Sequence, residues 1–346
     1  MALEVDIEKR IGSFHLRAAF SGGNEFLGIL GASGSGKSMT LKCIAGIERP
    51  DRGRIVLDGR VLFDSERRID LPPQQRRVGY LFQHYALFPG MTVRQNILCG
   101  LHAEKDKQVR EKRTDEMLEL LQIRDIASQR PETLSGGEAQ RTALGRILVN
   151  GPDMLMLDEP FSALDAHLRL KLQAELKELL SGYGKGIIMV THDRDEAYRM
   201  CDRLAVMEQG KMQAAKGTKE LFADPETRAA AVLTGCKNIA AAEKTGEREV
   251  FVPEWGIHLR TGQTVRSGLT AIGIRAHDFR PEIRENRFSV RTQREIEEPF
   301  ERICEFRFET QAPGSPPVWW RYSRDARREE SPEHLGVLPE KVLQLY

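Results

Sequence analysis

The sequence lacks the features that mark membrane-spanning and secreted proteins. Its 346 residues contain no apolar run near the roughly 20 residues that a membrane helix needs, because runs such as GIIMV and MLML have only the length of strands. The first residues, MALEVDIEKR, lack the apolar core of a signal peptide. We therefore expect any role at a membrane to come through a partner.

Cysteine usage and net charge exclude two further classes. The five cysteines are scattered and odd in number, no pair has the spacing of a zinc site, and the eight histidines are equally dispersed. This pattern favours a reducing, cytoplasmic compartment without a disulfide framework. The 52 lysines and arginines nearly balance the 51 acidic residues, so the formal charge of +1 gives no reason to expect a nucleic-acid partner.

What the sequence does contain is an alternation of buried strands and helices. The run FLGIL is continuously apolar, and DMLMLDEP and GIIMVTH also contain buried strands. Helical patterns separate these runs, which predicts an α/β fold with a largely parallel sheet covered on both faces. Between residue 84 and about residue 129 the pattern becomes helical, and past about residue 236 short strand-like runs dominate. We therefore predict a domain over 1–235, with a helical subdomain at about 84–146, and a β-rich domain over 236–346.

The clearest motif is GASGSGKS, which fits G-x-x-x-x-G-K-S and lies between a buried strand and a helix. Its glycines let the backbone fold around an anion, and the helix N-terminus adds partial positive charge. The motif predicts that Lys37 reaches the β- and γ-phosphates of ATP and that Ser38 holds Mg²⁺. The predicted nucleotide-binding residues of this loop are Gly31, Ala32, Ser33, Gly34, Ser35, Gly36, Lys37, Ser38 and Met39.

Polar residues at the ends of three other strands predict the rest of the catalytic half-site. Asp158 ends an apolar strand and is expected to bind the Mg²⁺ shell, and Glu159 follows it and can polarise a water molecule. Gln83 also follows a strand and is predicted to contact Mg²⁺ or the attacking water. His192 is predicted to bridge the γ-phosphate and that water, although a lone histidine is more often structural.

A second candidate anion cradle, LSGGEAQR, contains Ser135, Gly136 and Gly137 at a helix start. These residues offer a hydroxyl and backbone N–H groups but no lysine and no metal ligand, so they form half of a site. If two copies face each other head to tail, each phosphate loop meets the partner's LSGG. The sequence therefore predicts a homodimer with ATP in two composite interface sites.

Together, and in this order, GASGSGKS, Gln83, LSGGEAQR, MLMLDEP, SALD and VTHD resemble the motif series of the ABC ATPases over about two-thirds of the chain. The resemblance implies a RecA-like P-loop ATPase core with antiparallel β and helical subdomains, followed by a barrel-like C-terminal domain of the OB or TOBE type. It implies that LSGG contacts ATP bound to the partner, that Glu159 is the catalytic base and that Asp165 helps to link the two sites.

Finer features resemble the importers within that family. LPPQQRRVGYLFQHYALFPGMTVRQNI is similar to importer ATPases for oxyanions and sugars, and GRIVLDGRVLFD with the C-terminal strands most resembles the molybdate/sulfate group. This implies an ATPase on the cytoplasmic face of the plasma (inner) membrane. It would bind transmembrane permease subunits through HYALFPGMTV and serve an extracytoplasmic solute-binding protein indirectly.

Several alternatives stay open at this stage. The motor motifs are shared with sugar and polyamine importers, whereas a soluble ABC protein is disfavoured by the single cassette and the absence of sustained heptads. A pure regulator is disfavoured by the intact Glu159 and His192. Phe14 is the one aromatic near the first strand that could stack on adenine, but it also fits the core. Arg275 and His277 could contact an anion, but a solvated strand end is the favoured interpretation.

Overall fold

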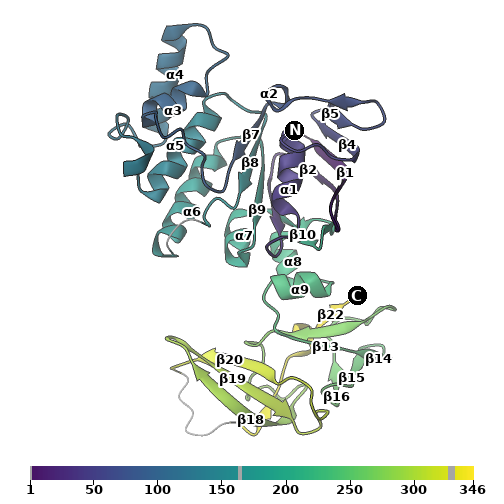
Figure 1. Ribbon diagram of the computed structural model, residues 1–346. Helices are drawn as coiled ribbons and strands as arrows, with labels where there is room; N and C mark the ends of the chain where they lie inside the picture. Colours follow the sequence, from purple (N-terminus) through teal and green to yellow (C-terminus); the bar gives the residue numbers. More distant parts are fainter. Residues whose placement is uncertain (1, 163–165, 326–331) are drawn as a thin grey trace. The chain divides into compact units, whose positions relative to one another are not determined.

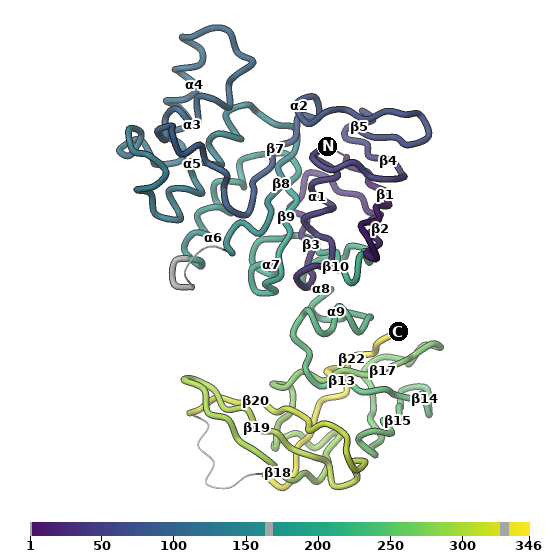
Figure 2. Tube along the Cα trace, viewed as in Figure 1, coloured from purple at the N-terminus to yellow at the C-terminus, as the bar shows by residue number. Residues whose placement is uncertain are grey.

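The computed structural model describes residues 2–162, 166–325 and 332–346, and Figures 1 and 2 show their course. They form two compact units, Met1–Thr218 and Lys219–Tyr346. The domain boundary expected from the sequence lies later in the chain, after residue 235, and stays a prediction. No helix in the described residues is long and apolar enough to cross a membrane.

The first unit carries the alternating strands and helices that the apolar runs predict. Its strands are β1 (Leu3–Ile11), β2 (Phe14–Gly22), β3 (Phe26–Leu30), β4 (Arg52–Leu57), β5 (Arg60–Asp64), β6 (Ile69–Asp70), β7 (Val78–Leu81), β8 (Met154–Asp158), β9 (Gly186–Thr191), β10 (Arg203–Glu208), β11 (Lys211–Met212) and β12 (Lys216–Gly217). Its helices are α1 (Lys37–Ala45), α2 (Pro73–Arg76), α3 (Val93–Cys99), α4 (Lys107–Leu120), η1 (Pro131–Thr133), α5 (Gly136–Leu148), α6 (Ala166–Ser181) and α7 (Arg194–Met200), and α8 (Thr218–Ala223) begins at its last residue.

One continuous sheet runs through this unit in the order β6-β5-β4-β1-β2-β11-β10-β3-β9-β8-β7, with β12 paired to β10. The pairs from β10 to β7 are parallel, and β1, β2, β4, β5 and β6 pair antiparallel. Every residue of β3, β8 and β9 is buried, as expected for central parallel strands with both faces covered. The carboxyl ends of β3, β9, β8 and β7 therefore lie next to one another at one edge of the sheet.

Helix α1 is enclosed between the antiparallel and the parallel strands. Its buried residues Leu41, Cys43 and Ile44 share one core with residues of β1, β2, β4, β5, β8 and β9. The helix ends at Gly46, whose φ of 77° is the left-handed conformation that favours glycine at a helix C-terminus. This packing holds the start of α1, and with it the glycine loop, rigidly at the sheet edge.

The helices between β7 and β8 form a part of the unit with its own core. Val93, Ile97, Leu118, Leu121 and Ile123 cluster with neighbouring apolar residues of α3 and α4, and α5 packs against α3 and β7. Figure 1 shows α3, α4 and α5 grouped beyond β7, away from the antiparallel strands. A helical segment therefore interrupts the β/α alternation, as the change in sequence pattern predicts.

The second unit consists mainly of short strands around one core. Its elements are α9 (Arg228–Leu233), β13 (Asn238–Ala241), β14 (Glu243–Gly246), β15 (Glu249–Val252), β16 (Ile257–Arg260), β17 (Ala271–Ile274), β18 (Phe288–Glu297), β19 (Glu301–Phe308), β20 (Val318–Ser323), β21 (His334–Leu335), η2 (Pro339–Lys341) and β22 (Leu343–Leu345). They form the sheets β13-β17-β22, β14-β15-β16 and β20-β19-β18-β21. Val250, Phe279, Phe306 and Trp320 lie in the core that these sheets share, which is consistent with a barrel-like domain. The predicted fold class is confirmed.

Candidate nucleotide-binding site

The glycine loop Gly31–Gly36 joins β3 to α1 at the sheet edge described above. Gly34 and Gly36 have φ values of 78° and 109°, which residues with a Cβ rarely adopt. A Cβ on Gly31 would lie 2.4 Å from the carbonyl oxygen of Met207, so this position also requires glycine. The loop can thus bring successive backbone N–H groups around an anion.

The loop is closed around the amine of Lys37. Lys37 Nζ donates hydrogen bonds to the carbonyls of Gly31 and Ala32, each at 2.9 Å, and lies 3.9 Å from Glu159 Oε1. Burial lowers the pKa of the Lys37 ammonium, and the charges of Glu159 and Asp158 oppose that shift. Lys37 is only 4% exposed, and its ammonium is bonded to neutral carbonyl oxygens. A charged phosphate oxygen is a stronger acceptor and can replace them.

Ser38 and Asp158, the predicted Mg²⁺ ligands, contact each other directly. Ser38 Oγ donates to Asp158 Oδ1 at 2.7 Å, and the hydroxyl of Tyr80 donates to Asp158 Oδ2 at 2.7 Å. Burial and the neighbouring Asp158 charge raise the pKa of Tyr80, so its hydroxyl remains a donor. Tyr80 lies on β7 and holds the carboxylate toward Ser38. Sequence reasoning missed Tyr80, because nothing in its local pattern distinguishes it from a core residue.

Glu159 and His192 form a pair at the same sheet edge. His192 Nδ1 lies 3.1 Å from Glu159 Oε2, and the Glu159 side chain is largely buried. Glu159 has a φ of 45°, a left-handed conformation that is costly for a residue with a side chain. Such strain is concentrated at functional sites, and here it turns the carboxylate from the end of β8 toward Lys37 and His192.

Gln83 and His84 lie in the exposed segment that follows β7, at the same edge of the sheet. Four predicted features therefore follow adjacent parallel strands: the glycine loop after β3, His192 after β9, Asp158 and Glu159 at the end of β8, and Gln83 after β7. The structure thereby brings the strand-end residues of the half-site to one edge. Met39 adds a backbone N–H in the first turn of α1, while its side chain packs on the core.

Ser135, Gly136 and Gly137 are not part of that cluster. Ser135 is the N-cap of α5, in a capping box with Glu138, and Ser135 and Gly136 are exposed. In Figure 1 strands β7 and β8 lie between α5 and α1, and no hydrogen bond or ion pair between the described residues joins 135–137 to the glycine loop. Within the described residues the second cradle is therefore bonded only within its own capping box and not to this chain's phosphate loop. Asp165 lies outside the described residues.

Two arginines have structural partners instead of ligands. Arg76 is fully buried and donates to the carbonyls of Leu71, Cys43 and Ile44, so it completes the C-terminus of α1. Arg275, which the sequence left open as an anion contact or a solvated strand end, donates to the carbonyls of Thr234 and Phe222. Arg275 directly follows β17 and is half-buried, so its guanidinium bonds to carbonyls at the ends of two helices while it stays partly open to water.

The described residues fit Mg²⁺ and ATP as ligands. Ser35 Oγ is buried and has no hydrogen-bond partner among residues 2–162, 166–325 and 332–346, and it lies just before the first turn of α1. A hydroxyl and a carboxylate oxygen, from Ser38 and Asp158, form the hard oxygen pair that Mg²⁺ accepts when phosphates and water complete its shell. Phe14 packs on the core, with its ring 3.1 Å from where a Cβ on Gly36 would lie.

Comparison with known proteins places this geometry in a family. The family model described as ABC transporter matches residues 21–162. The chain is 42% identical over 238 residues to the spermidine/putrescine import ATP-binding protein PotA of Bacillus cereus, covering 68% of this chain and 70% of that protein. It is 41% identical over 226 residues to the molybdenum import ATP-binding protein ModC of Paramagnetospirillum magneticum, covering 65% of this chain and 62% of that protein.

Solved structures agree with this assignment. The dimeric ATP-binding cassette MJ0796 in a post-hydrolysis state, bound to ADP and Pi, aligns with a TM-score of 0.53 and 27% identity over 63% of this chain and 99% of that chain. A second dimeric structure of MJ0796 aligns equally well, at 28% identity. The chain therefore belongs to the ABC transporter family as an ATP-binding subunit of the importer type, an ATPase that binds ATP with Mg²⁺ and couples its hydrolysis to transport.

Proposed function

We propose that two copies of this chain form the motor of an oxyanion importer, with ATP held between the glycine loop of one copy and residues 135–137 of the other. The observation that carries this proposal is the separation of the two anion cradles. Lys37 and Ser38 gather at one sheet edge, while Ser135 and Gly136 are exposed at the start of α5. A composite site explains both, and the aligned MJ0796 structures are dimers.

In this proposal each residue of the half-site has one task. Lys37 exchanges its two carbonyl partners for phosphate oxygens, and Ser38 and Asp158 hold Mg²⁺. Glu159 accepts a proton from the attacking water as general base. His192, at 3.1 Å, donates from Nδ1 to orient the Glu159 carboxylate before ATP arrives and turns toward the γ-phosphate afterwards.

The partner that receives the motion is proposed to dock on the loop between β7 and α3. Three apolar side chains of this segment are exposed to water, Phe82 (38%), Phe88 (48%) and Met91 (36%). Neighbouring exposed apolar groups are typical of interaction sites. The predicted contact segment HYALFPGMTV contains two of them, and Gln83 lies in the same loop. A permease subunit bound here would place the ATPase on the cytoplasmic face of the membrane.

The transported solute divides the proposal into two candidates. An oxyanion such as molybdate or sulfate is favoured by the sequence features of the importer subgroup and by the 41% identity to ModC. A polyamine is favoured by the 42% identity to PotA, at similar coverage. In either case an extracytoplasmic binding protein would choose the solute, and the β-rich unit is proposed to regulate transport.

Reconstitution with the neighbouring permease and binding protein in liposomes tests both parts of the proposal. ATP turnover would be measured with molybdate, tungstate, sulfate, spermidine, putrescine and maltose in turn. We expect stimulation by an oxyanion. Stimulation by a polyamine or sugar alone would replace the oxyanion assignment while keeping the motor, and a wild-type complex that no solute stimulates would contradict the importer proposal itself.

A further inference from the structure

The loop between β7 and α3 is held from inside by helix α5. Arg146 of α5 donates to the carbonyls of Ala86 (2.8 Å) and Tyr85 (3.0 Å), and its guanidinium lies 5.0 Å from the centroid of the Phe88 ring. Tyr85 and Ala86 have φ values of 59° and 47°, which are strained for residues with side chains. Because such a conformation persists only when its surroundings enforce it, the shape of this loop depends on α5.

The carbonyl of Pro160 joins the same loop to the catalytic turn. The hydroxyl of Tyr85 donates to Pro160 O at 3.2 Å, and Gln140 Nε2 of α5 donates to the same oxygen at 3.1 Å. Tyr85 is 7% and Gln140 2% exposed, and burial raises the pKa of Tyr85 to about 12, so its hydroxyl keeps the proton that it donates. One carbonyl therefore connects the exposed loop, the helix that begins with the second cradle, and the residue that follows Glu159.

The turn at Pro160 has little freedom to absorb a displacement. Glu159 N donates to Val190 O at 3.0 Å, and both the N–H and the hydroxyl of Ser162 donate to Glu159 O, at 3.2 and 2.9 Å. The proline ring fixes φ at Pro160, so few torsions separate its carbonyl from Glu159. A shift of this carbonyl is therefore passed to the backbone that carries the Glu159 carboxylate.

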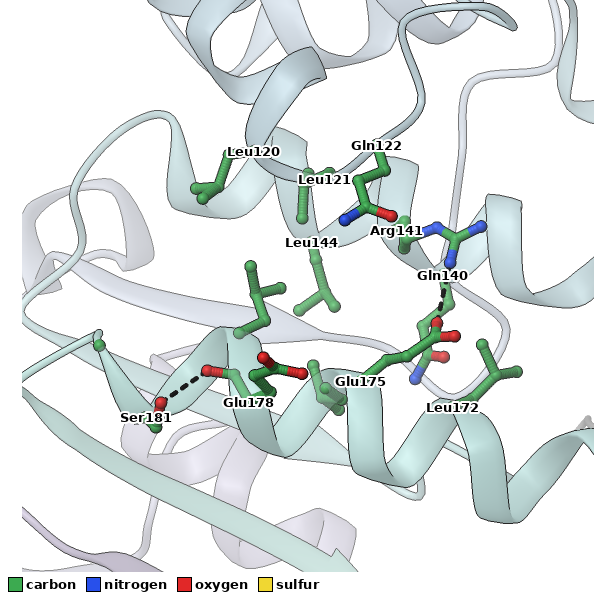
Figure 3. Close-up of a pocket in the computed structure, with 13 residues that line it drawn as sticks. Leu120, Leu121, Gln122, Gln140, Arg141, Leu144, Leu172, Glu175, Glu178 and Ser181 are labelled. Atoms are coloured by element: carbon green, nitrogen blue, oxygen red, sulfur yellow. Dashed lines mark hydrogen bonds and ion pairs between the residues drawn. The ribbon is translucent and has the colours of Figure 1, made fainter.

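A pocket lies beside the same part of α5. It has a volume of about 420 Å³. Figure 3 draws the residues of α5 and α6 that line it. Gln140 and Leu144 line it from α5, and Leu172 and Leu176 line it from α6. The Arg141–Glu175 ion pair, at 3.0 Å, crosses its rim. Gln140, which donates to Pro160 O, therefore also borders this pocket.

We propose that Tyr85 is a positioning residue for the ATPase reaction, which acts on Glu159 through the carbonyl of Pro160. The inference rests on the proposed function, in which a partner binds the loop that carries Phe82, Phe88 and Met91. Tyr85 would pass the displacement of this loop on to the catalytic turn. When the partner moves the loop, the Tyr85 hydroxyl draws Pro160 with it, and Glu159 changes its position relative to Lys37 and the second cradle.

The experiment compares Tyr85→Phe with Tyr183→Phe, which removes the same kind of bond at the other end of β8. The Tyr183 hydroxyl donates to the carbonyl of Pro152 at 2.8 Å, and Lys185 Nζ is the second donor there. Both variants keep the aromatic ring and lose only the hydroxyl, so both are expected to fold. For Tyr85→Phe we expect the solute-stimulated kcat of the reconstituted complex to fall about fivefold, with the KM for ATP unchanged. Tyr183→Phe should leave kcat and KM as in the wild type.

A second measurement on the isolated chain needs no permease. The amide of Ser162 is bonded within the catalytic turn, so its hydrogen exchange should accelerate about fivefold in Tyr85→Phe and not in Tyr183→Phe. Equal exchange and equal stimulation in the two variants would overturn the inference. If no solute stimulates the ATPase activity of the wild-type complex, both the proposed function and the transfer of loop displacement to the turn are contradicted. The hydrogen-exchange rates of the Ser162 amide would still decide whether Tyr85 positions the turn.

Discussion

The carboxyl group of Glu196 predicts an unusual dependence of stability on pH. Glu196 lies on α7, is 4% exposed, and accepts a hydrogen bond of 2.5 Å from the Thr191 hydroxyl, while its other oxygen has no partner. Burial raises the pKa of Glu196 from 4.5 to about 7; the nearby Asp193 and Glu159 charges act in the same direction, and the Thr191 bond opposes them. The folded protein therefore favours the neutral carboxyl.

The sign and size of the effect follow from proton linkage. Below pH 4.5 the group is neutral in both states, and its contribution to stability is fully present. As the pH rises toward 7 the unfolded chain releases the proton while the folded protein keeps it, so stability is lost over this window. At about 1.4 kcal/mol per pH unit, the interval from 4.5 to about 7 corresponds to a loss of about 3 kcal/mol.

The Glu196→Gln variant isolates this contribution, since glutamine is neutral at every pH and still offers an oxygen to Thr191. Urea unfolding of the first unit would be followed from pH 5 to pH 8 in both proteins. We expect the variant's free energy of unfolding, relative to the wild type, to grow by about 2 kcal/mol over this range. Glu66→Gln, at an exposed carboxylate, is the control. A difference between Glu196→Gln and the wild type that stays constant with pH would refute the reasoning.

Three further predictions concern the site and its support. Glu159→Gln should still bind ATP, hydrolyse it at least about 100-fold more slowly and form an ATP-dependent dimer. A monomer in size-exclusion chromatography with ATP and Mg²⁺ would contradict the composite site. Lys37→Ala should weaken ATP binding by at least about tenfold in calorimetry, because a charge-assisted contact is lost; near-normal affinity would contradict the phosphate-loop assignment. Arg76→Met should lower the free energy of unfolding by about 3 kcal/mol, because the Cys43 and Ile44 carbonyls lose their donor; unchanged stability in urea would show that water replaces it.

The site residues that the sequence predicted share a local signature. The glycine loop, Asp158 and His192 each follow an apolar strand, and parallel strands carry their carboxyl ends to one edge. Positions 34 and 36 require glycine because their backbone φ angles are positive. Such features can be read along the chain, because strand burial, strand ends and glycine positions are encoded by neighbouring residues.

The partners of those residues could not be read in the same way. Tyr80 orients Asp158 from another strand, Tyr85 and Gln140 converge on Pro160 from a loop and a helix, and Glu196 owes its raised pKa to burial. These relations depend on which side chains the packing brings within about 3 Å, and on how much water it excludes. The motifs along the chain thus determined the chemistry of half a nucleotide site, whereas only the tertiary structure decided how its carboxylates are held, because hydrogen bonds between distant residues leave no periodic pattern in a sequence.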